Sequence, residues 1–120
     1  MFDLPVLPLE TIKVDYRNNQ PFPHLVFDGF FNPEDLNLVL KEFPDLSAFS
    51  KSSHLNNSRQ QKFSLSEYEL FGQNTQLLIK ALNSPAFLKF LSGLTGIEEE
   101  LLADDSLLGG GLHEIRRNGH

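Results

Sequence analysis

Apolar residues recur at helical spacing shortly after Asn32. Four of them follow at i, i+3, i+4 and i+7, namely Leu36, Val39, Leu40 and Phe43. This spacing puts side chains on one face of a helix. Asn32 is a favourable N-cap, Pro33 suits the first helical position, and Pro44 cannot continue a helix. The sequence therefore predicts an amphipathic helix that begins at Pro33 and ends before Pro44.

Two more helices are predicted in the second half of the chain. One runs from near Ser66 to Leu82, and its shared face holds Phe71, Thr75, Leu78 and Leu82. After it, Ser84 can cap a new helix that has Pro85 in its first turn and Gly96 at its C-terminus. The apolar stripe of this third helix consists of Phe87, Leu88, Leu91 and Leu94.

Three stretches have the composition of strands. "ETIKVDY" alternates, with Ile12 and Val14 on one face, and "HLVFDGFF" is rich in strand formers from His24 to about Phe30. "SLLGGGLHEIRR" forms the last strand, and Asn118-Gly119 after it is a strong hairpin signal. The signal predicts that the sheet continues beyond residue 120. Strands segregated from helices indicate an α+β fold, in a single domain 1–120 that we expect to be incomplete.

A polar stretch separates the first two helices, between Pro44 and Phe63. Its centre, "SKSSHLNNSRQQK" from Ser50 to Lys62, holds too little apolar surface to fix a structure. We expect a long, mobile loop there. Loops of this length are usually functional or disordered, so the segment is either a substrate lid or a solvated connection.

Composition narrows the classes of function. The 120-residue chain has a formal net charge of −6, and its only basic pair is Arg116-Arg117. This argues against a nucleic-acid partner, because neutralising phosphates needs a basic surface. The absence of cysteine excludes disulfides, thiolate metal sites and a cysteine nucleophile within the chain. Because no apolar run is long enough to cross a membrane and no signal peptide is visible, we expect no membrane association and a cytoplasmic location.

Three blocks of the sequence carry a family likeness. They are "PFPHLVFDGFFNPEDLNLVLKEFP", "SPAFLKFLSGLTGI" and "LLADDSLLGGGLHEIRRNGH". In this order and spacing they resemble the iron(II)- and 2-oxoglutarate-dependent dioxygenases related to the prolyl 4-hydroxylase catalytic domain. The likeness covers most of the chain from Pro21 to His120, apart from the polar loop. Its most specific parts are "LTGI" and "GGGLHEI".

The resemblance implies a fold, a reaction and cofactors. The fold would be a double-stranded β-helix, or jelly roll, to which this chain would supply outer helices and the first barrel strands. The reaction would couple decarboxylation of 2-oxoglutarate to hydroxylation of a C–H bond in a small molecule or a peptidyl side chain. Iron(II) would be held by two His and one carboxylate, with positions left open for 2-oxoglutarate and oxygen.

The chain departs from the family where the metal site should be. In the family, "GGGLHEI" leads into a strand that carries His-x-Asp, the first iron ligands. Counted from His120, these ligands would fall about four and six positions further on. The distal His and the anchor for 2-oxoglutarate would follow later still. We therefore expect no catalytic residue and no metal ligand among these residues, and no binding of iron(II) or 2-oxoglutarate by this chain alone.

His113 and Ile115 are the candidate active-site residues. If Asn118 and Gly119 form a two-residue hairpin loop, His113 lies opposite the expected position of the first iron ligand. Opposed residues share a face of the sheet, so His113 and Ile115 would line the interior beside the metal. A register error of one residue would place them on the outer face instead, and both orientations stay open.

The other chemistry-bearing residues have ordinary structural explanations. His24, His54 and His120 show no metal-ligand spacing. Gly109–Gly111 lacks the Lys-Ser/Thr of a phosphate-binding loop and predicts close backbone packing at a barrel corner. The Arg116-Arg117 pair is typical of solvated turn residues rather than of an anion site.

Two functions follow from these observations. The first is the N-terminal portion of a 2-oxoglutarate-dependent hydroxylase, inactive without the iron ligands that it lacks. The second is a degenerate, non-catalytic binding or interaction module of the same fold. Such a module would expose an unpaired strand edge, through which it would self-associate or bind a partner strand. Whether the protein is an enzyme depends on residues beyond His120.

Overall fold

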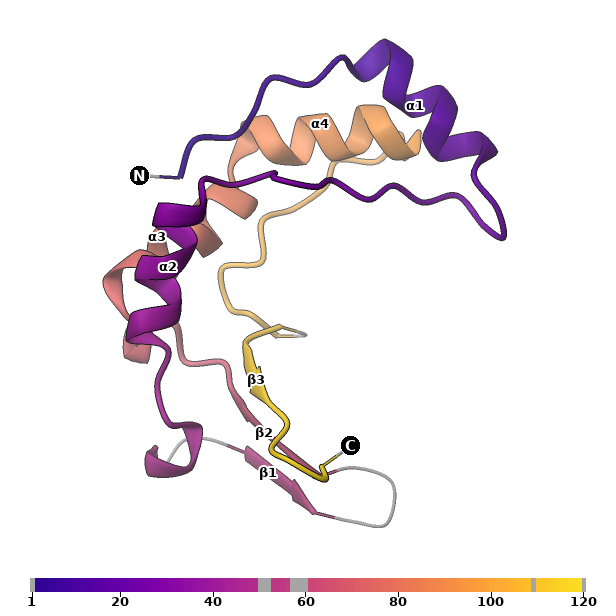
Figure 1. The fold of residues 1–120 in the computed structure, drawn as a ribbon. Coiled ribbons are helices and arrows are strands. Elements are labelled where there is room, and N and C mark those ends of the chain that lie inside the picture. Colours follow the sequence, from indigo (N-terminus) through magenta and orange to yellow (C-terminus); the bar gives the residue numbers. More distant parts are fainter. Residues whose placement is uncertain (1, 50–52, 57–60, 109, 120) are drawn as a thin grey trace.

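The computed structural model describes residues 2–49, 53–56, 61–108 and 110–119. Helices α1 and α4 lie at one end of the molecule and a small sheet lies at the other (Figure 1). In chain order the elements are α1 (Leu9–Asn18), α2 (Pro33–Glu42), the 3-10 helix η1 (Leu46–Ala48), β1 (Ser53–Asn56), β2 (Gln61–Leu65), the 3-10 helix η2 (Tyr68–Leu70), α3 (Gln73–Leu82), α4 (Pro85–Thr95) and β3 (Leu112–Glu114).

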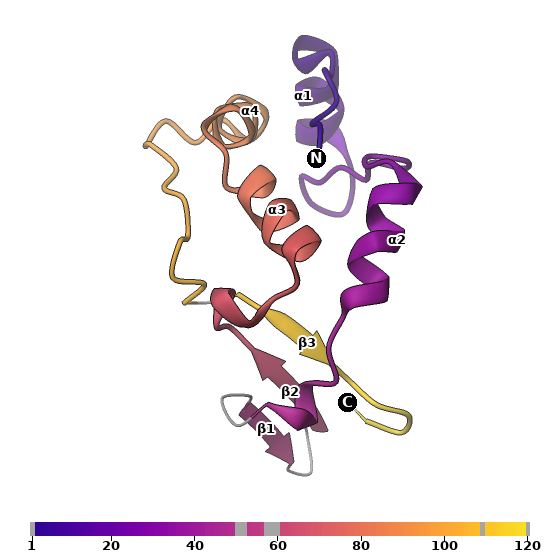
Figure 2. The ribbon, with the colours of Figure 1, turned by 90° about the vertical axis from the view of Figure 1, so that its left-hand side faces the viewer.

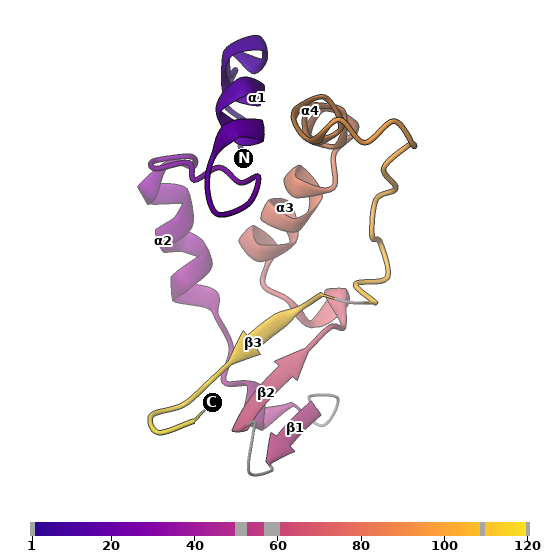
Figure 3. The same ribbon diagram turned by 90° about the vertical axis from the view of Figure 1, so that its right-hand side faces the viewer.

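The sheet is antiparallel and open, with the strand order β1-β2-β3 (Figure 3). In the register of β2 and β3, Leu65 opposes Leu112 and Ser64 opposes His113. Among the described residues no further strand joins the sheet, so no barrel closes. The predicted jelly-roll fold is therefore wrong, because these residues form a helix-rich fold with a single small sheet.

The predicted strand at "ETIKVDY" is wrong because this stretch belongs to α1. Four residues of the helix are half-buried at i, i+3, i+4 and i+7, namely Leu9, Ile12, Lys13 and Tyr16. This is the spacing of a helical face. Helix α1 packs against α4, whereas Val14 is 51% exposed. Burial against a neighbouring helix thus outweighs the short alternation of β-branched residues.

The predicted strand from His24 to Phe30 is also absent. The segment turns at Asp28–Gly29, where Gly29 has a left-handed φ of 64°. Its aromatic rings pack on α4 instead of on a partner strand, because Phe27 lies 6.2 Å from Phe90 and Phe30 lies 6.0 Å from Phe87 between ring centroids. The strand-like composition of this segment therefore reflects aromatic packing against a helix.

The capping signals of two helices are confirmed. The Asn32 side chain accepts a hydrogen bond from the Glu34 amide at 2.8 Å at the start of α2. The Ser84 hydroxyl accepts one from the Phe87 amide at 3.2 Å at the start of α4, and Gly96 ends that helix with a φ of 76°. Helix α3 begins later than predicted, since η2 occupies the preceding turn.

The stretch predicted as a mobile polar loop contains regular structure. The 3-10 helix η1 and strands β1 and β2 lie within it or overlap it, and Leu46 of η1 is fully buried. Residues 50–52 and 57–60 of this stretch lie outside the described residues. The segment is polar on average, but its fully buried Leu46 anchors its start to the core.

The buried core lies where the sheet meets η1 and the segments around α3. It contains Leu46, Leu65, Phe71, Leu107 and Leu112. Gly111 allows β3 to approach β2 here, because a Cβ atom at this position would lie 2.5 Å from the Leu65 carbonyl oxygen. The φ of Gly111 is 143°, which also favours glycine. The expected close backbone packing of glycine is thus present, although no barrel corner is involved.

Helix α2 contacts α3 on one side (Figure 2). Much of its apolar stripe is nevertheless uncovered, since Leu36 is 40% exposed and Leu40 is 71% exposed.

None of the single helices in the described part of the chain is long and apolar enough to cross a membrane. Helices α3 and α4, taken as a pair with a 44° bend, meet the requirements of length and composition.

Candidate functional site

The two predicted site residues lie at and just after β3. His113 is exposed and opposes Ser64 of β2. Ile115 follows the end of the strand and is 58% exposed. Leu112 and Glu114 alternate with them and point to the more buried face. The structure therefore leaves both side chains exposed, His113 in β3 and Ile115 just after it, and their role in catalysis stays a prediction.

The turn after β3 lies one residue earlier than predicted. Its central residues are Arg117 and Asn118, and the Gly119 amide donates to the Arg116 carbonyl oxygen at 2.8 Å. Asn118 has a φ of 66°, a conformation that asparagine tolerates better than most residues. Arg116, rather than Arg117, is thus the first residue of the turn. A turn one residue earlier changes the position that would face His113 on a following strand by two residues. Because side chains alternate between the two faces of a sheet, a shift of two residues leaves His113 on the same face as in the prediction.

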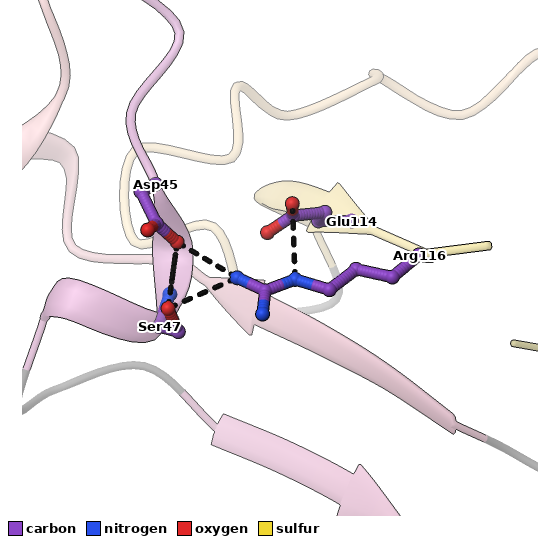
Figure 4. A network of polar contacts seen from close by, with 4 residues as sticks. All are labelled: Asp45, Ser47, Glu114 and Arg116. Atoms are coloured by element: carbon purple, nitrogen blue, oxygen red, sulfur yellow. Dashed lines mark hydrogen bonds and ion pairs between the residues drawn. The ribbon is translucent and has the colours of Figure 1, made fainter.

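The Arg116 side chain connects β3 to η1 (Figure 4). Its Nη2 atom donates to Asp45 Oδ1 and to Ser47 Oγ, both at 2.9 Å, while its Nε atom lies 3.4 Å from Glu114 Oε1. The guanidinium carbon also lies 4.7 Å from the centroid of the Phe63 ring, a cation–π distance. The expectation of a merely solvated Arg116 is therefore wrong, because both carboxylates and a ring engage it.

The Arg116 charge in this network is already paired with two carboxylates. The Ser47 hydroxyl and amide donate to Asp45, and together with the Arg116 charge they lower the pKa of Asp45 below its ordinary value of 3.8. One atom is left over, since Glu114 Oε2 is buried and finds no hydrogen-bond partner within the described part of the chain. With Arg116 shared between two carboxylates, the network is suited to holding β3 in place rather than to binding a further anion.

A second polar contact joins α2 to α3. The Glu42 carboxylate accepts hydrogen bonds from the Thr75 amide, from the Thr75 hydroxyl at 2.9 Å and from the Asn74 side chain at 3.1 Å. It thereby caps the N-terminus of α3, where free amides favour a negative charge. Gly72 leaves the room for it, because a side chain there would collide with Glu42.

The pKa of Glu42 reflects both its burial and these contacts. Burial raises the pKa, but the hydrogen bonds from Thr75 and Asn74 together lower it further, so the pKa lies below the ordinary value of 4.5. Glu42 is therefore a structural carboxylate that stays ionised near neutral pH.

The residues that the structure describes do not form an iron(II) site. No group of three or more His, Cys, Asp or Glu side chains within the described residues is placed to hold a metal ion. His54 lies in β1 and His24 bonds the Phe22 carbonyl through Nδ1 at 2.7 Å. Two His and one carboxylate do not converge here, so no reaction step is derived through a metal on these residues.

A large cavity of the described residues lies elsewhere, beside α4. It has a volume of about 810 Å³ and is lined by the segment of residues 4–9, by Phe30 and by one face of α4. Nothing in the sequence indicated this cavity. Its two walls are about 80 residues apart in the chain, and only the tertiary fold brings them together. We call it the N-terminal groove.

No family model, no curated protein and no solved structure matches this chain. The resemblance to the dioxygenases therefore rests on the sequence blocks alone.

The residues that sequence reasoning missed act over long separations. Arg116 and Asp45 are 71 residues apart, and Glu42 and Thr75 are 33 residues apart. Only the contacts between residues close in the sequence could have been predicted from it. The clearest is Asp45 two residues before Ser47, a spacing typical of a side-chain cap on a short helical turn.

Proposed function

We propose that this chain is the N-terminal portion of an iron(II)- and 2-oxoglutarate-dependent hydroxylase. The observation that carries the proposal is the ordered pair of motifs "LTGI" and "GGGLHEI", with the remaining block, "PFPHLVFDGFFNPEDLNLVLKEFP", before them at matching spacing. The intact protein would decarboxylate 2-oxoglutarate and hydroxylate a small molecule or a peptidyl side chain. The proposal concerns the reaction, and it does not depend on a barrel among these residues.

The arrangement around β3 is compatible with this proposal. Within the described residues β3 pairs with β2 alone, and the turn at Arg116–Gly119 reverses the chain. His113 is an exposed residue of this strand, and Ile115, also exposed, directly follows its end. We propose that they border the substrate site in the intact hydroxylase, whose iron ligands and 2-oxoglutarate anchor are residues outside this chain.

The coding sequence beyond codon 120 provides the test. We expect the reading frame to continue and to encode His-x-Asp within the next several residues. The longer product, supplied with iron(II) and 2-oxoglutarate, should release succinate, whereas the 120-residue chain should release none. A frame that stops at once, or a longer product that forms no succinate under any substrate screen, would contradict the proposal.

A second function is supported by the exposed apolar surface and strand edge. A non-catalytic interaction module would use the edge of β3 that no described strand covers, next to Ile115, to pair with a strand of another protein or of a second copy. Sedimentation velocity of the 120-residue chain should then show concentration-dependent association that Ile115→Lys reduces, since a lysine beside an edge strand disfavours pairing. If the chain is monomeric at all concentrations, the proposal that it self-associates is wrong.

A further inference from the structure

The N-terminal groove has the size of a ligand-binding site. Its volume of about 810 Å³ falls within the range of roughly 300–1,000 Å³ found for small-molecule sites. One wall is the segment of residues 4–9, which crosses beside α4 before α1 begins (Figure 1). The other wall is α4, against which α1 also packs.

The lining of the groove is mostly apolar. Phe30, Phe87 and Phe90 form a run of aromatic contacts, with Phe87 and Phe90 stacked at 6.0 Å. Residues 4–7, which are leucine, proline and valine, also line the groove. Ala86 and Gly93 also line it, and the small side chain of Ala86 leaves room on the face of α4. The Leu9 side chain packs over Gly93, where a Cβ atom would lie 2.8 Å from Leu9 Cδ2. A surface of this kind suits a hydrocarbon chain, because every methylene that it removes from water stabilises the complex.

Lys89 supplies the charge. It is the one cationic residue of the lining and lies between Ala86 and Gly93, about one helical turn from each. Within the described residues its ammonium group makes no ion pair. Glu100, the one acidic residue of the lining, follows the end of α4. An exposed ammonium group on the wall of an apolar groove is complementary to an anionic head group on an apolar tail.

We propose that the N-terminal groove binds an aliphatic carboxylate. The hydrocarbon chain lies between residues 4–9 and the phenylalanines of α4, and the carboxylate pairs with the Lys89 ammonium group. This site is separate from the face of β3 that carries His113, and it does not depend on the hydroxylase proposal.

Binding is tested on the 120-residue chain with dodecanoate, which displaces 11-(dansylamino)undecanoate from the protein. The chain contains no tryptophan, so the dansyl emission is read without that background. We expect dodecanoate to bind at least tenfold more tightly than dodecyltrimethylammonium, and roughly tenfold more tightly than decanoate, which has two fewer methylenes. Equal affinity for the anionic and cationic amphiphiles would overturn the proposal.

Two matched charge variants test the head-group contact. Lys89→Gln should weaken dodecanoate binding by roughly tenfold and leave dodecanol binding unchanged, since only the anion loses a charged partner. Glu100→Gln, which removes a charge from the same lining, should leave dodecanoate affinity equal or higher. If Lys89→Gln binds dodecanoate as well as the wild type, the carboxylate is not at Lys89 and the proposal is wrong.

Two variants of the walls test the location. Ala86→Phe should fill the groove and abolish binding of both dodecanoate and dodecanol. Val6→Glu places a charge on a fully exposed side chain of the other wall, so it should weaken binding without affecting the fold, and it replaces Ala86→Phe if that variant loses its circular dichroism spectrum. Unchanged binding in a folded wall variant would show that the amphiphile binds elsewhere.

Discussion

Glu42 joins two helices through one carboxylate. It ends α2, and it accepts three hydrogen bonds from the first turn of α3. Buried or half-buried carboxylates need such donors, because an unsatisfied charge is costly away from water. At the scale of single residues, this contact and that of Arg116 hold the elements in their relative positions.

Replacing Glu42 should destabilise the protein. Glu42→Gln keeps the shape but replaces a charged acceptor with a neutral one, so we expect the free energy of unfolding to fall by about 1 kcal/mol. Urea unfolding followed by circular dichroism measures the change. Glu99→Gln, at an exposed position, is the control and should stay within about 0.5 kcal/mol of the wild type. Equal losses in both variants would mean that Glu42 caps nothing.

The Glu42 contact should also depend on pH. Because the pKa of Glu42 is lowered in the folded state from its ordinary value of 4.5, its contribution to stability is complete above that value. The contribution is lost as the pH falls through the folded-state pKa, where the carboxylate becomes protonated. We therefore expect the stability difference between wild type and Glu42→Gln to shrink on acidification below pH 4.5. A difference that is constant across this range would contradict the assignment.

The helices and strands of this protein depend on contacts with neighbouring elements as much as on the intrinsic propensities of their residues. Strand β3 is short, and it is held by three contacts: pairing with β2, the glycine that precedes it and the Arg116 network that follows it. The capping residues of α2 and α4 were readable from the sequence because a cap is a local interaction. The formation of α1 where a strand was predicted could not be inferred from the sequence. The helix is stabilised by packing against α4, which is distant in sequence.

Gly111→Ala should weaken the pairing of β2 and β3. The new Cβ atom would meet the Leu65 carbonyl oxygen at 2.5 Å, at a φ that an L residue rarely adopts. We expect a loss of about 1–3 kcal/mol in the free energy of unfolding. Gly110→Ala is the matched control, because its Cβ atom would make an ordinary contact at 3.7 Å with the Leu107 side chain. Thermal unfolding of the two variants distinguishes backbone collision from a general effect of the glycine run.

Arg116→Ala should loosen the end of β3 without unfolding the protein. The side chain is half exposed, so its ion pairs contribute modestly, at most about 1 kcal/mol. The readout is amide hydrogen exchange, which we expect to accelerate at Leu112–Glu114 and not in α4. Arg117→Ala, in the same turn, should leave exchange in β3 unchanged. Faster exchange in both variants would assign the effect to the turn rather than to the network.

The whole molecule is less compact than its length suggests. Its radius of gyration is 16.6 Å over Cα atoms, whereas a compact domain of this size has about 14 Å. Figure 1 shows the reason, because the helical end and the sheet lie apart and are joined by α2, α3 and the segment before β3. The open shape leaves Leu40 and Ile115 exposed, which is the surface that a partner would cover.

Small-angle X-ray scattering tests this shape. Extrapolated to infinite dilution, the radius of gyration of the 120-residue chain should lie at or slightly above 16.6 Å, since hydration adds to the Cα value. A value near 14 Å, as expected for a compact chain of this length, would mean that the two ends close on one another in solution. Concentration-dependent growth would instead report association.

The sequence by itself determined the features that arise within a few residues. These are the capped starts of α2 and α4, the glycine at the end of α4, the strand character of residues 112–114 and the presence of a turn after them, although not its position. The tertiary structure alone decided whether ambiguous stretches became helix or strand, and it decided the open sheet in place of a barrel. It also created the Glu42 cap, the Arg116 network and the N-terminal groove. Propensity and capping act locally, whereas burial and ion pairing depend on partners that only the folded chain brings together.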